Sequence, residues 1–365
     1  MKTLKNLYKT LTKERIKEII LKASKGKKHR REVKKVLNDI DYYTNNIYEM
    51  IQNKTYYMLP THNKEIMEKG KVRNLTISPF YPNRILDYII VETLKPYIRK
   101  SMYIYCIGNV DNKGMVYGKK VIARKYKHYK YYIKLDIKKF YPSTKSIKLM
   151  EHIENKVKDK DFIELCRKVV LSVEDMPIGS YYSQWFSNWF LQDLDHLIKE
   201  KLQIPFYIRY VDDMLLMGNN KRKLLNAMYS IERWLQDKDL TLKRREQVYT
   251  TEQKPIDFLG FRFCEDKIIL RTRNFKKLNT KVKRIRKHKH ICVSQARSLM
   301  SYVGWLKQIK LGWKYYFNHI KPIISLGALR RIISSYEKKR LYLNRVGIGN
   351  SDYRHYECNT HTNLY

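Results

Sequence analysis

Hydrophobic positions near the start of the chain recur at the spacing of amphipathic helices. Ile16, Ile19 and Ile20 lie on one stripe of a first helix, and a second helical pattern runs over residues 30–51. From residue 56 the pattern shortens, which predicts strands and turns before a helix over 85–98.

The rest of the chain alternates short strands with longer helices. Apolar or alternating runs predict strands over residues 74–78, 131–135, 206–218 and 256–263, the third of them folded back at a turn. Helical spacing marks residues 146–157, 183–197, 221–236, 275–288, 294–309 and 322–343, whereas the glycine-rich residues 108–119 are expected to form a loop. Strands and helices mixed in this way predict an α+β fold.

Two adjacent aspartates, Asp212 and Asp213, interrupt the apolar run of residues 206–218. Neighbouring side chains of a strand point to opposite faces, so two adjacent carboxylates converge only at a turn. A solvated hairpin turn is the simplest explanation of an Asp-Asp pair, but the apolar flanks place this pair in a core, where unpaired charge is unfavourable. Asp136 follows the predicted strand 131–135 and can meet the pair if the two strands are neighbours.

Three carboxylates at neighbouring strand ends repel one another unless cations share their charge. Magnesium suits ligands that are all oxygen, and two such ions are what metal-assisted phosphoryl transfer requires. The sequence therefore predicts a two-magnesium site.

The charge of the chain points to a polyanionic partner. Its formal net charge is +41, from 76 Lys and Arg against 35 Asp and Glu, which favours nucleic acid. The 31 tyrosines are partly explained by an AT-rich coding sequence, but tyrosines interleaved with lysines over residues 125–132 also suit base stacking and phosphate contact.

Further residues suit a nucleotide. Lys64, Lys71 and Arg73 lie beside a predicted strand and could hold a triphosphate, although a generic basic surface explains most individual lysines of so basic a chain. The small and polar residues from Gly179 to Gln184 would let the backbone approach a base pair closely.

The five cysteines are scattered and include no CxxC pair, which is typical of a reducing cytoplasm. No segment has the apolar length of a signal peptide or a membrane span, so a cytoplasmic protein without membrane association is expected.

Five motifs stand in the order found in reverse transcriptases, and the chain resembles that family. They are KVRNLTISPFYPNRILDYII (71–90), KLDIKKFYPS (134–143), MPIGSYYSQWFSNW (176–189), YVDD (210–213) and DFLGF (257–261). Within the family, GSYYSQ and the later SYVGWLK (301–307) resemble the enzymes of diversity-generating retroelements.

The resemblance implies a right-hand polymerase with fingers, an antiparallel palm sheet with packed helices, and a helical thumb. The implied divisions are a basic helical extension (1–55), fingers (56–130, with a further portion around 145–177), palm (131–265), thumb (266–345) and a C-terminal tail (346–365).

The resemblance also assigns roles to single residues. Asp136, Asp212 and Asp213 would be the catalytic metal ligands, together with the Ile137 carbonyl. Tyr141 would be the aromatic gate that excludes a 2′-hydroxyl. The incoming nucleotide would contact Lys64, Lys71, Arg73, Tyr141, Ile178, Gly179 and Gln184, and the primer would contact Tyr210, Phe258, Leu259 and Gly260.

Ile178 stands where many relatives carry a glutamine that contacts the incoming nucleotide. A pocket without that polar contact discriminates less between bases. In diversity-generating enzymes this change accompanies errors opposite template adenine. Near Lys243–Glu246, relatives often place a lysine that protonates the leaving pyrophosphate, and no residue of this chain is assigned that role.

The implied function is RNA-directed DNA polymerisation, in which a template-repeat RNA is copied into adenine-mutagenised cDNA. The implied partners are a structured RNA, the cDNA primer and product, deoxynucleoside triphosphates and a small basic accessory variability protein. Two alternatives stay open: a phage-defence reverse transcriptase, and a maturase-like RNA-binding protein without catalysis.

Overall fold

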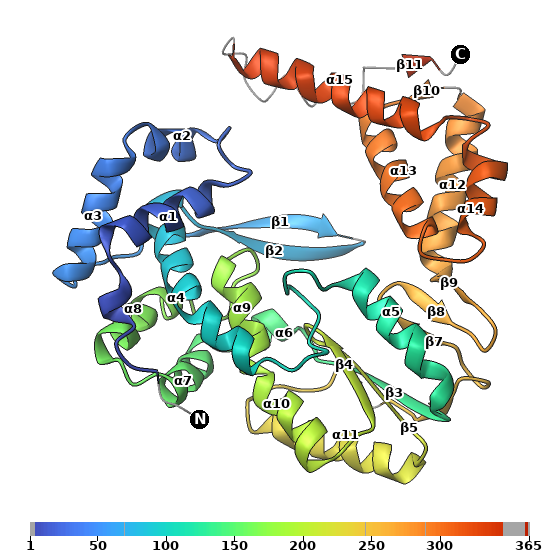
Figure 1. Cartoon of the computed structure of the whole chain (residues 1–365), viewed down its shortest axis with the longest axis horizontal. Helices are drawn as coiled ribbons and strands as arrows, with labels where there is room; N and C mark the ends of the chain where they lie inside the picture. Colours follow the sequence, from blue (N-terminus) through green and yellow to red (C-terminus); the bar gives the residue numbers. More distant parts are fainter. Residues whose placement is uncertain (1–3, 69, 245, 289, 346–361, 364–365) are drawn as a thin grey trace. The chain divides into compact units, whose positions relative to one another are not determined.

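The computed structural model describes residues 4–68, 70–244, 246–288, 290–345 and 362–363 (Figure 1). Its internal contacts divide the chain into two compact units. The first consists of Met1–Gly114 and Tyr131–Val248, and the second of Met115–Lys130 and Tyr249–Tyr365. The five-part division expected from the sequence stays a prediction, and its tail lies outside the described residues apart from Thr362–Asn363.

The first unit begins with helices, as the hydrophobic spacing predicts. The short 3₁₀ turn Tyr8–Thr10 precedes α1 (Lys13–Ser24), whose apolar stripe is buried, and the Thr12 side chain caps α1 by accepting a hydrogen bond from the Arg15 amide. The single helix expected over 30–51 is wrong: α2 (Arg31–Asn38) and α3 (Ile40–Gln52) are separate. Asp39 leaves the helical region between them, with φ −134° and ψ 55°.

A long β-hairpin follows, built from β1 (His62–Glu68) and β2 (Lys71–Ile77) in antiparallel register. The π-helical turn Phe80–Arg84 then leads into α4 (Ile85–Ser101), whose buried residues pack against α1 and α9 (Tyr181–Phe190). The expected strand and helix of this region are therefore confirmed.

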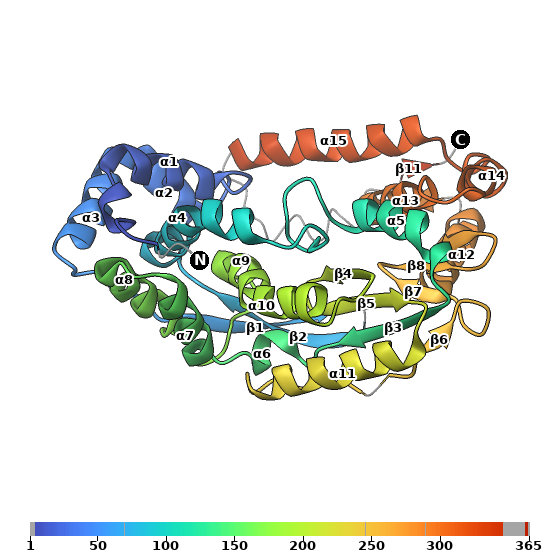
Figure 2. The same ribbon diagram turned by 60° about the horizontal axis from the view of Figure 1, so that its bottom comes forward.

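The central sheet of the first unit has the strand order β4-β5-β3, antiparallel throughout: β3 (Tyr131–Asp136), β4 (Phe206–Tyr210) and β5 (Asp213–Gly218). Figure 2 shows α11 (Lys221–Gln236) running along this sheet, and its apolar side packs on β3 and β5. Four of the five β4 residues and five of the six β5 residues are buried, so the sheet is a core element on both faces.

Short helices complete the first unit. The remaining ones are α6 (Phe140–Ser143), α7 (Ser146–Lys156), α8 (Lys160–Val170), α10 (Gln192–His196) and the π-helical turn Leu197–Lys201. The helix expected over 183–197 begins two residues earlier, at Tyr181, and is interrupted at Leu191. Its aromatic stripe is buried as expected of core packing.

The second unit joins α5 (Met115–Lys125) and the 3₁₀ turn Tyr126–His128 to the C-terminal part of the chain. That part holds β6 (Tyr249–Thr250), the antiparallel β7 (Ile256–Phe258), β8 (Phe261–Phe263) and β9 (Ile268–Leu270), then α12 (Thr272–His288), β10 (His290–Ile291), α13 (Val293–Leu306), α14 (Gly312–Tyr315), the π-helical turn Tyr316–Ile320, α15 (Leu326–Arg345) and β11 (Thr362–Asn363).

Two expectations for residues 108–132 are wrong in part. The glycine-rich loop ends early, because α5 begins at Met115. Tyr126 and Tyr132 are buried, so these two rings are not available for base stacking: Tyr126 packs against Phe263, and its hydroxyl donates to the Cys264 carbonyl at 3.1 Å. Across the described residues, no helix has the length and apolarity needed to cross a membrane.

Candidate active site

The β4–β5 hairpin carries the adjacent aspartates at its turn. Tyr210 is paired with Asp213, which leaves Val211 and Asp212 as the turn residues. Asp213 is in turn paired with Asp136 across β5 and β3. The register therefore brings the three predicted carboxylates to one end of the sheet.

The three carboxylates influence one another electrostatically. The pKa of Asp212 is raised to about 6, mainly by burial and then by the negative charges of Asp213 and Asp136. A backbone hydrogen bond and the Lys243 ammonium act in the opposite direction but are outweighed. The site is thus one where added positive charge would be stabilising.

Two lysines contact these carboxylates. Lys243 Nζ lies 2.6 Å from Asp136 Oδ2, and Lys134 Nζ lies 3.4 Å from Asp213 Oδ1. The hydrogen bond with Asp136 raises the pKa of Lys243, so the ammonium stays protonated. A short bridge positions Lys243, because Ile137 pairs with Leu242 and the Lys243 amide donates to the Asp136 carbonyl at 2.8 Å.

A divalent metal fits the donor chemistry of this site. As placed, the residues that the structure describes include no group of three or more His, Cys, Asp or Glu side chains that could hold a metal ion. The carboxylates are nevertheless hard oxygen donors, burial and mutual repulsion raise the pKa of Asp212, and Asp136 is already engaged by the Lys243 cation. Magnesium binding here remains a prediction.

Tyr141 lies beside Asp212. It is on α6, directly after β3 in the chain, and burial raises its pKa. The Asp212 charge raises that pKa further, while hydrogen bonds with Ser187 and Asn109 lower it. Burial raises the pKa of Tyr210, and the charge of Asp213 raises it further.

Ile178 and Gly179 lie against the β1–β2 hairpin. The Thr76 amide donates to the Ile178 carbonyl at 2.9 Å. Gly179 has φ +116°, and a Cβ there would lie 3.1 Å from both Leu75 Cδ1 and the Thr76 carbonyl oxygen. Only glycine fits both this backbone conformation and this close approach.

The hairpin face that meets Gly179 also carries two of the predicted triphosphate contacts. Alternate residues of a strand share a face, so Arg73 lies on the same face as Leu75, and Lys64 is the cross-strand partner of Leu75. Both basic side chains are exposed. Lys71 begins β2, and its side chain lies outside the described part of the chain. Gln184 is exposed on α9.

Two residues that the sequence analysis missed hold this region in place. Asp87 on α4 is buried and accepts hydrogen bonds from the Tyr181 and Tyr182 amides, at 2.9 and 3.3 Å, which caps the start of α9. Arg84 donates to the Gly179 carbonyl at 3.2 Å. Their positions inside the motif of residues 71–90 are the only sequence signal that could have suggested them.

The predicted primer contacts Phe258, Leu259 and Gly260 belong to the second unit. Phe258 pairs with Phe261, so Leu259 and Gly260 form a two-residue turn, with φ of +51° and +81°. Positive φ at both positions is the type I′ hairpin geometry. A Cβ on Gly260 would lie 2.5 Å from the Trp305 ring, so this turn packs closely on α13.

Comparison with known proteins gives a family match and more distant similarities. The family described as Reverse transcriptase (RNA-dependent DNA polymerase) matches residues 59–263, which is more than half of the chain. The Retron Ec73 reverse transcriptase of Escherichia coli is 30% identical over 106 residues, which cover 25% of this chain and 34% of that protein. The chain thus matches about one third of the length of this relative. The solved structure of apo telomerase from Candida tropicalis has a TM-score of 0.45 and 14% identity, covering 80% of this chain and 59% of that one.

Proposed function

Because the chain belongs to the reverse transcriptase family, we propose that it is an RNA-directed DNA polymerase that acts at Asp136, Asp212 and Asp213. The observation that supports this best is the register of β3, β4 and β5, which gathers the three carboxylates at one end of a buried sheet. The strongly basic composition suits a nucleic-acid substrate. A cytoplasmic location fits, since template RNA and deoxynucleoside triphosphates are present there.

In this proposal Asp136 and Asp212 hold two magnesium ions, with Asp213 and the Ile137 carbonyl as further ligands. Bound ions would lower the pKa of the primer 3′-hydroxyl and stabilise the charge on the leaving pyrophosphate. The chain itself orients the reactants: Arg73, together with Lys64 and Lys71, binds the triphosphate from the β1–β2 hairpin.

Three further residues shape the reaction. The Tyr141 ring, whose pKa is raised by burial and by the charge of Asp212, would exclude a ribose 2′-hydroxyl. The Lys243 ammonium, whose pKa is raised by its hydrogen bond to Asp136, would give a proton to the departing pyrophosphate. Phe258, Leu259 and Gly260 would contact the primer from the turn between β7 and β8.

Primer extension on an RNA template with magnesium tests this function. The wild type should extend the primer, and Asp212→Ala should not, with circular dichroism showing that both proteins are folded. Equal extension by both would refute the metal assignment. No extension by either, even with cognate RNA and accessory protein, would instead favour the maturase-like alternative.

We further propose that the enzyme belongs to a diversity-generating retroelement. The support is the motif with Ile178 followed by GSYYSQ, and the later SYVGWLK. The enzyme would copy a template-repeat RNA into adenine-mutagenised cDNA, together with a structured RNA and a small basic accessory protein.

A phage-defence reverse transcriptase is the second candidate, because part of the chain is 30% identical to a retron enzyme. Sequencing the neighbouring genes separates the two. An imperfect repeat pair whose differences fall at adenines supports the retroelement, and toxin genes without such a pair support defence.

A further inference from the structure

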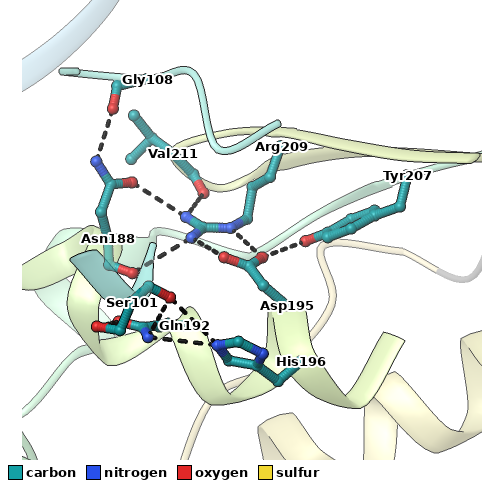
Figure 3. Close-up of polar contacts among 9 residues, drawn as sticks. All are labelled: Ser101, Gly108, Asn188, Gln192, Asp195, His196, Tyr207, Arg209 and Val211. Carbon is teal, nitrogen blue, oxygen red and sulfur yellow. Dashed lines mark hydrogen bonds and ion pairs between the residues drawn. The ribbon is translucent and has the colours of Figure 1, made fainter. Parts of the chain in front are cut away.

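A fully buried arginine contacts Val211, in the turn between β4 and β5 (Figure 3). Arg209 is on β4, next to Tyr210, and its guanidinium forms a bidentate ion pair with Asp195 of α10, with Nε–Oδ1 at 2.7 Å and Nη2–Oδ2 at 2.5 Å. Nη1 donates to Asn188 Oδ1 at 3.1 Å and to the Val211 carbonyl at 2.9 Å, and Nη2 donates to the Asn188 carbonyl at 3.3 Å. These five hydrogen bonds match the five N–H groups of a guanidinium.

Fold stability alone does not explain this cluster. A buried ion pair loses about as much in desolvation as it gains in attraction, and apolar residues of similar volume often stabilise a core equally well. Apolar residues could not donate a hydrogen bond to the Val211 carbonyl, at the residue before Asp212.

Val211 needs such support because its backbone is strained. It has φ +58°, and a β-branched residue in the left-handed region is disfavoured by roughly 1–3 kcal/mol. The surrounding structure therefore has to impose the turn that the local sequence disfavours.

A second contact holds the turn from its other side. Gly108 approaches Val211 so closely that a Cβ on it would lie 2.6 Å from both Val211 Cγ2 and the Val211 amide nitrogen. The Gly108 carbonyl accepts a hydrogen bond from Asn188 Nδ2 at 2.6 Å, and Asn188 also accepts from Arg209. Asn188 thus ties together the two groups that enclose Val211 (Figure 3).

We infer that Asp195, Asn188 and Arg209 are positioning residues: they hold Val211 in its left-handed conformation and thereby fix the Asp212 carboxylate relative to Asp136. The effect on catalysis rests on the proposed polymerase function, whereas the effect on the turn does not. None of the three side chains needs to touch substrate.

Arg209→Lys tests the inference. Lysine keeps the positive charge next to Asp195, but its ammonium has three donors and cannot hydrogen-bond to Asp195, Asn188 and Val211 at once. Tyr207→Phe is the matched control. It removes a buried 2.7 Å hydrogen bond to the same Asp195 carboxylate from the same strand, but leaves the Val211 contact intact. Both variants are made in the full chain.

The first readout is hydrogen–deuterium exchange of the protein alone. Arg209→Lys should speed exchange in the peptide spanning residues 206–216 by about tenfold or more, with β3 unchanged, whereas Tyr207→Phe should leave that peptide as in the wild type. The second readout is primer extension. Arg209→Lys should lower kcat on the order of 10²-fold, while the KM for the deoxynucleotide stays within about twofold.

Wild-type exchange at residues 206–216 in Arg209→Lys would overturn the inference, as would an equal effect of Tyr207→Phe. If Arg209→Lys does not fold, Asn188→Ala replaces it. This variant keeps the Arg209–Asp195 ion pair but removes the side-chain hydrogen bonds that join Gly108 to Arg209. Wild-type exchange in Asn188→Ala would also refute the inference. A wild type that extends no primer, even with cognate RNA and accessory protein, would refute the proposed function, and the exchange experiment would still decide the role of the cluster.

Discussion

Lys243 and Asp136 are joined twice, through their side chains at 2.6 Å and through a backbone hydrogen bond at 2.8 Å. The backbone hydrogen bond fixes the position of Lys243. The side-chain contact pairs its ammonium with the Asp136 carboxylate, which is a predicted metal ligand. Any divalent ion that binds Asp136 must compete with that ammonium.

Lys243→Met should therefore strengthen metal binding by the protein alone. The Lys243 side chain is about half exposed, so its ion pair is worth at most about 1 kcal/mol. About a threefold fall in the Kd for Mn²⁺, measured by electron paramagnetic resonance, is therefore expected. Lys145→Met is the control, since it removes the same charge from an ion pair with Glu174 and Asp175. Weaker Mn²⁺ binding by Lys243→Met would contradict the competition.

Asp87→Asn should change how stability depends on pH. Burial raises the pKa of Asp87 from 3.8 to about 6. The hydrogen bonds from the Tyr181 and Tyr182 amides and the charges of Arg84 and Lys27 oppose this shift. Between about pH 4 and 6 the Asp87 carboxyl is therefore protonated in the folded protein and ionised in the unfolded chain. The stabilisation is complete below about pH 4 and is lost as the pH rises through 6.

The unfolding free energy of the wild type, relative to Asp87→Asn, should thus fall by roughly 3 kcal/mol between pH 4 and pH 7.5. Urea unfolding at both pH values measures it. A difference that does not change with pH would show that Asp87 titrates normally.

Tyr141→Ala should admit ribonucleotides. Without the ring beside Asp212 there is room for a 2′-hydroxyl, so the ratio of kcat/KM for dCTP to that for CTP should drop by about 10–100-fold. Tyr141→Phe keeps the ring and should keep the ratio. Unchanged selectivity in the alanine variant would remove Tyr141 from sugar discrimination.

Ile178→Gln should reduce errors opposite template adenine. The Ile178 carbonyl is fixed by the Thr76 amide, so the substitution changes the side chain in a held backbone and correct incorporation should change little. Sequencing of cDNA products gives the error spectrum, with Ile178→Val as the apolar control. If the glutamine variant makes the same errors as the wild type, the pocket's infidelity has another origin.

Gly260→Ala should destabilise the second unit by about 2–4 kcal/mol. The added Cβ would meet the Trp305 ring at 2.5 Å, and φ +81° is unfavourable for alanine. Gly304→Ala is a close control, because it lies in α13 next to Trp305, where a Cβ meets nothing within 4 Å; it should stabilise by about 0.5–1 kcal/mol.

Thermal unfolding followed by tryptophan fluorescence measures both glycine variants. Adding Trp305→Leu to Gly260→Ala should recover part of the loss. If Gly260→Ala were as stable as the wild type, the close packing of this turn on α13 would be wrong.

The parts of the site that follow from strand ends could be predicted from the sequence. Apolar runs that stop at Asp136 and at Asp212 locate strand termini, and antiparallel pairing then brings them together. The helix over 85–98 and the hairpin over 256–263 were equally readable, because their spacing is regular over several residues.

The parts that depend on contacts between distant elements could not be predicted. Lys243 reaches Asp136 only because Leu242 bridges to Ile137, and the partner of Arg209 lies on another element, at Asp195. Local pattern also misled: Tyr126 belongs to a basic and aromatic stretch typical of a binding surface, yet it is buried against Phe263. The roles of the nucleotide and primer contacts stay predictions.

The division of the chain into units has a consequence for how the protein is synthesised. Residues 115–130 belong with the segment that begins at Tyr249, so Tyr126 leaves the ribosome well before its partners Phe263 and Cys264. During translation Tyr126 lacks these partners until more than a hundred further residues have been added. A recombinant first unit ending at Val248 would still contain residues 115–130 without the segment that they belong with. Replacing residues 115–130 by a short linker would avoid this.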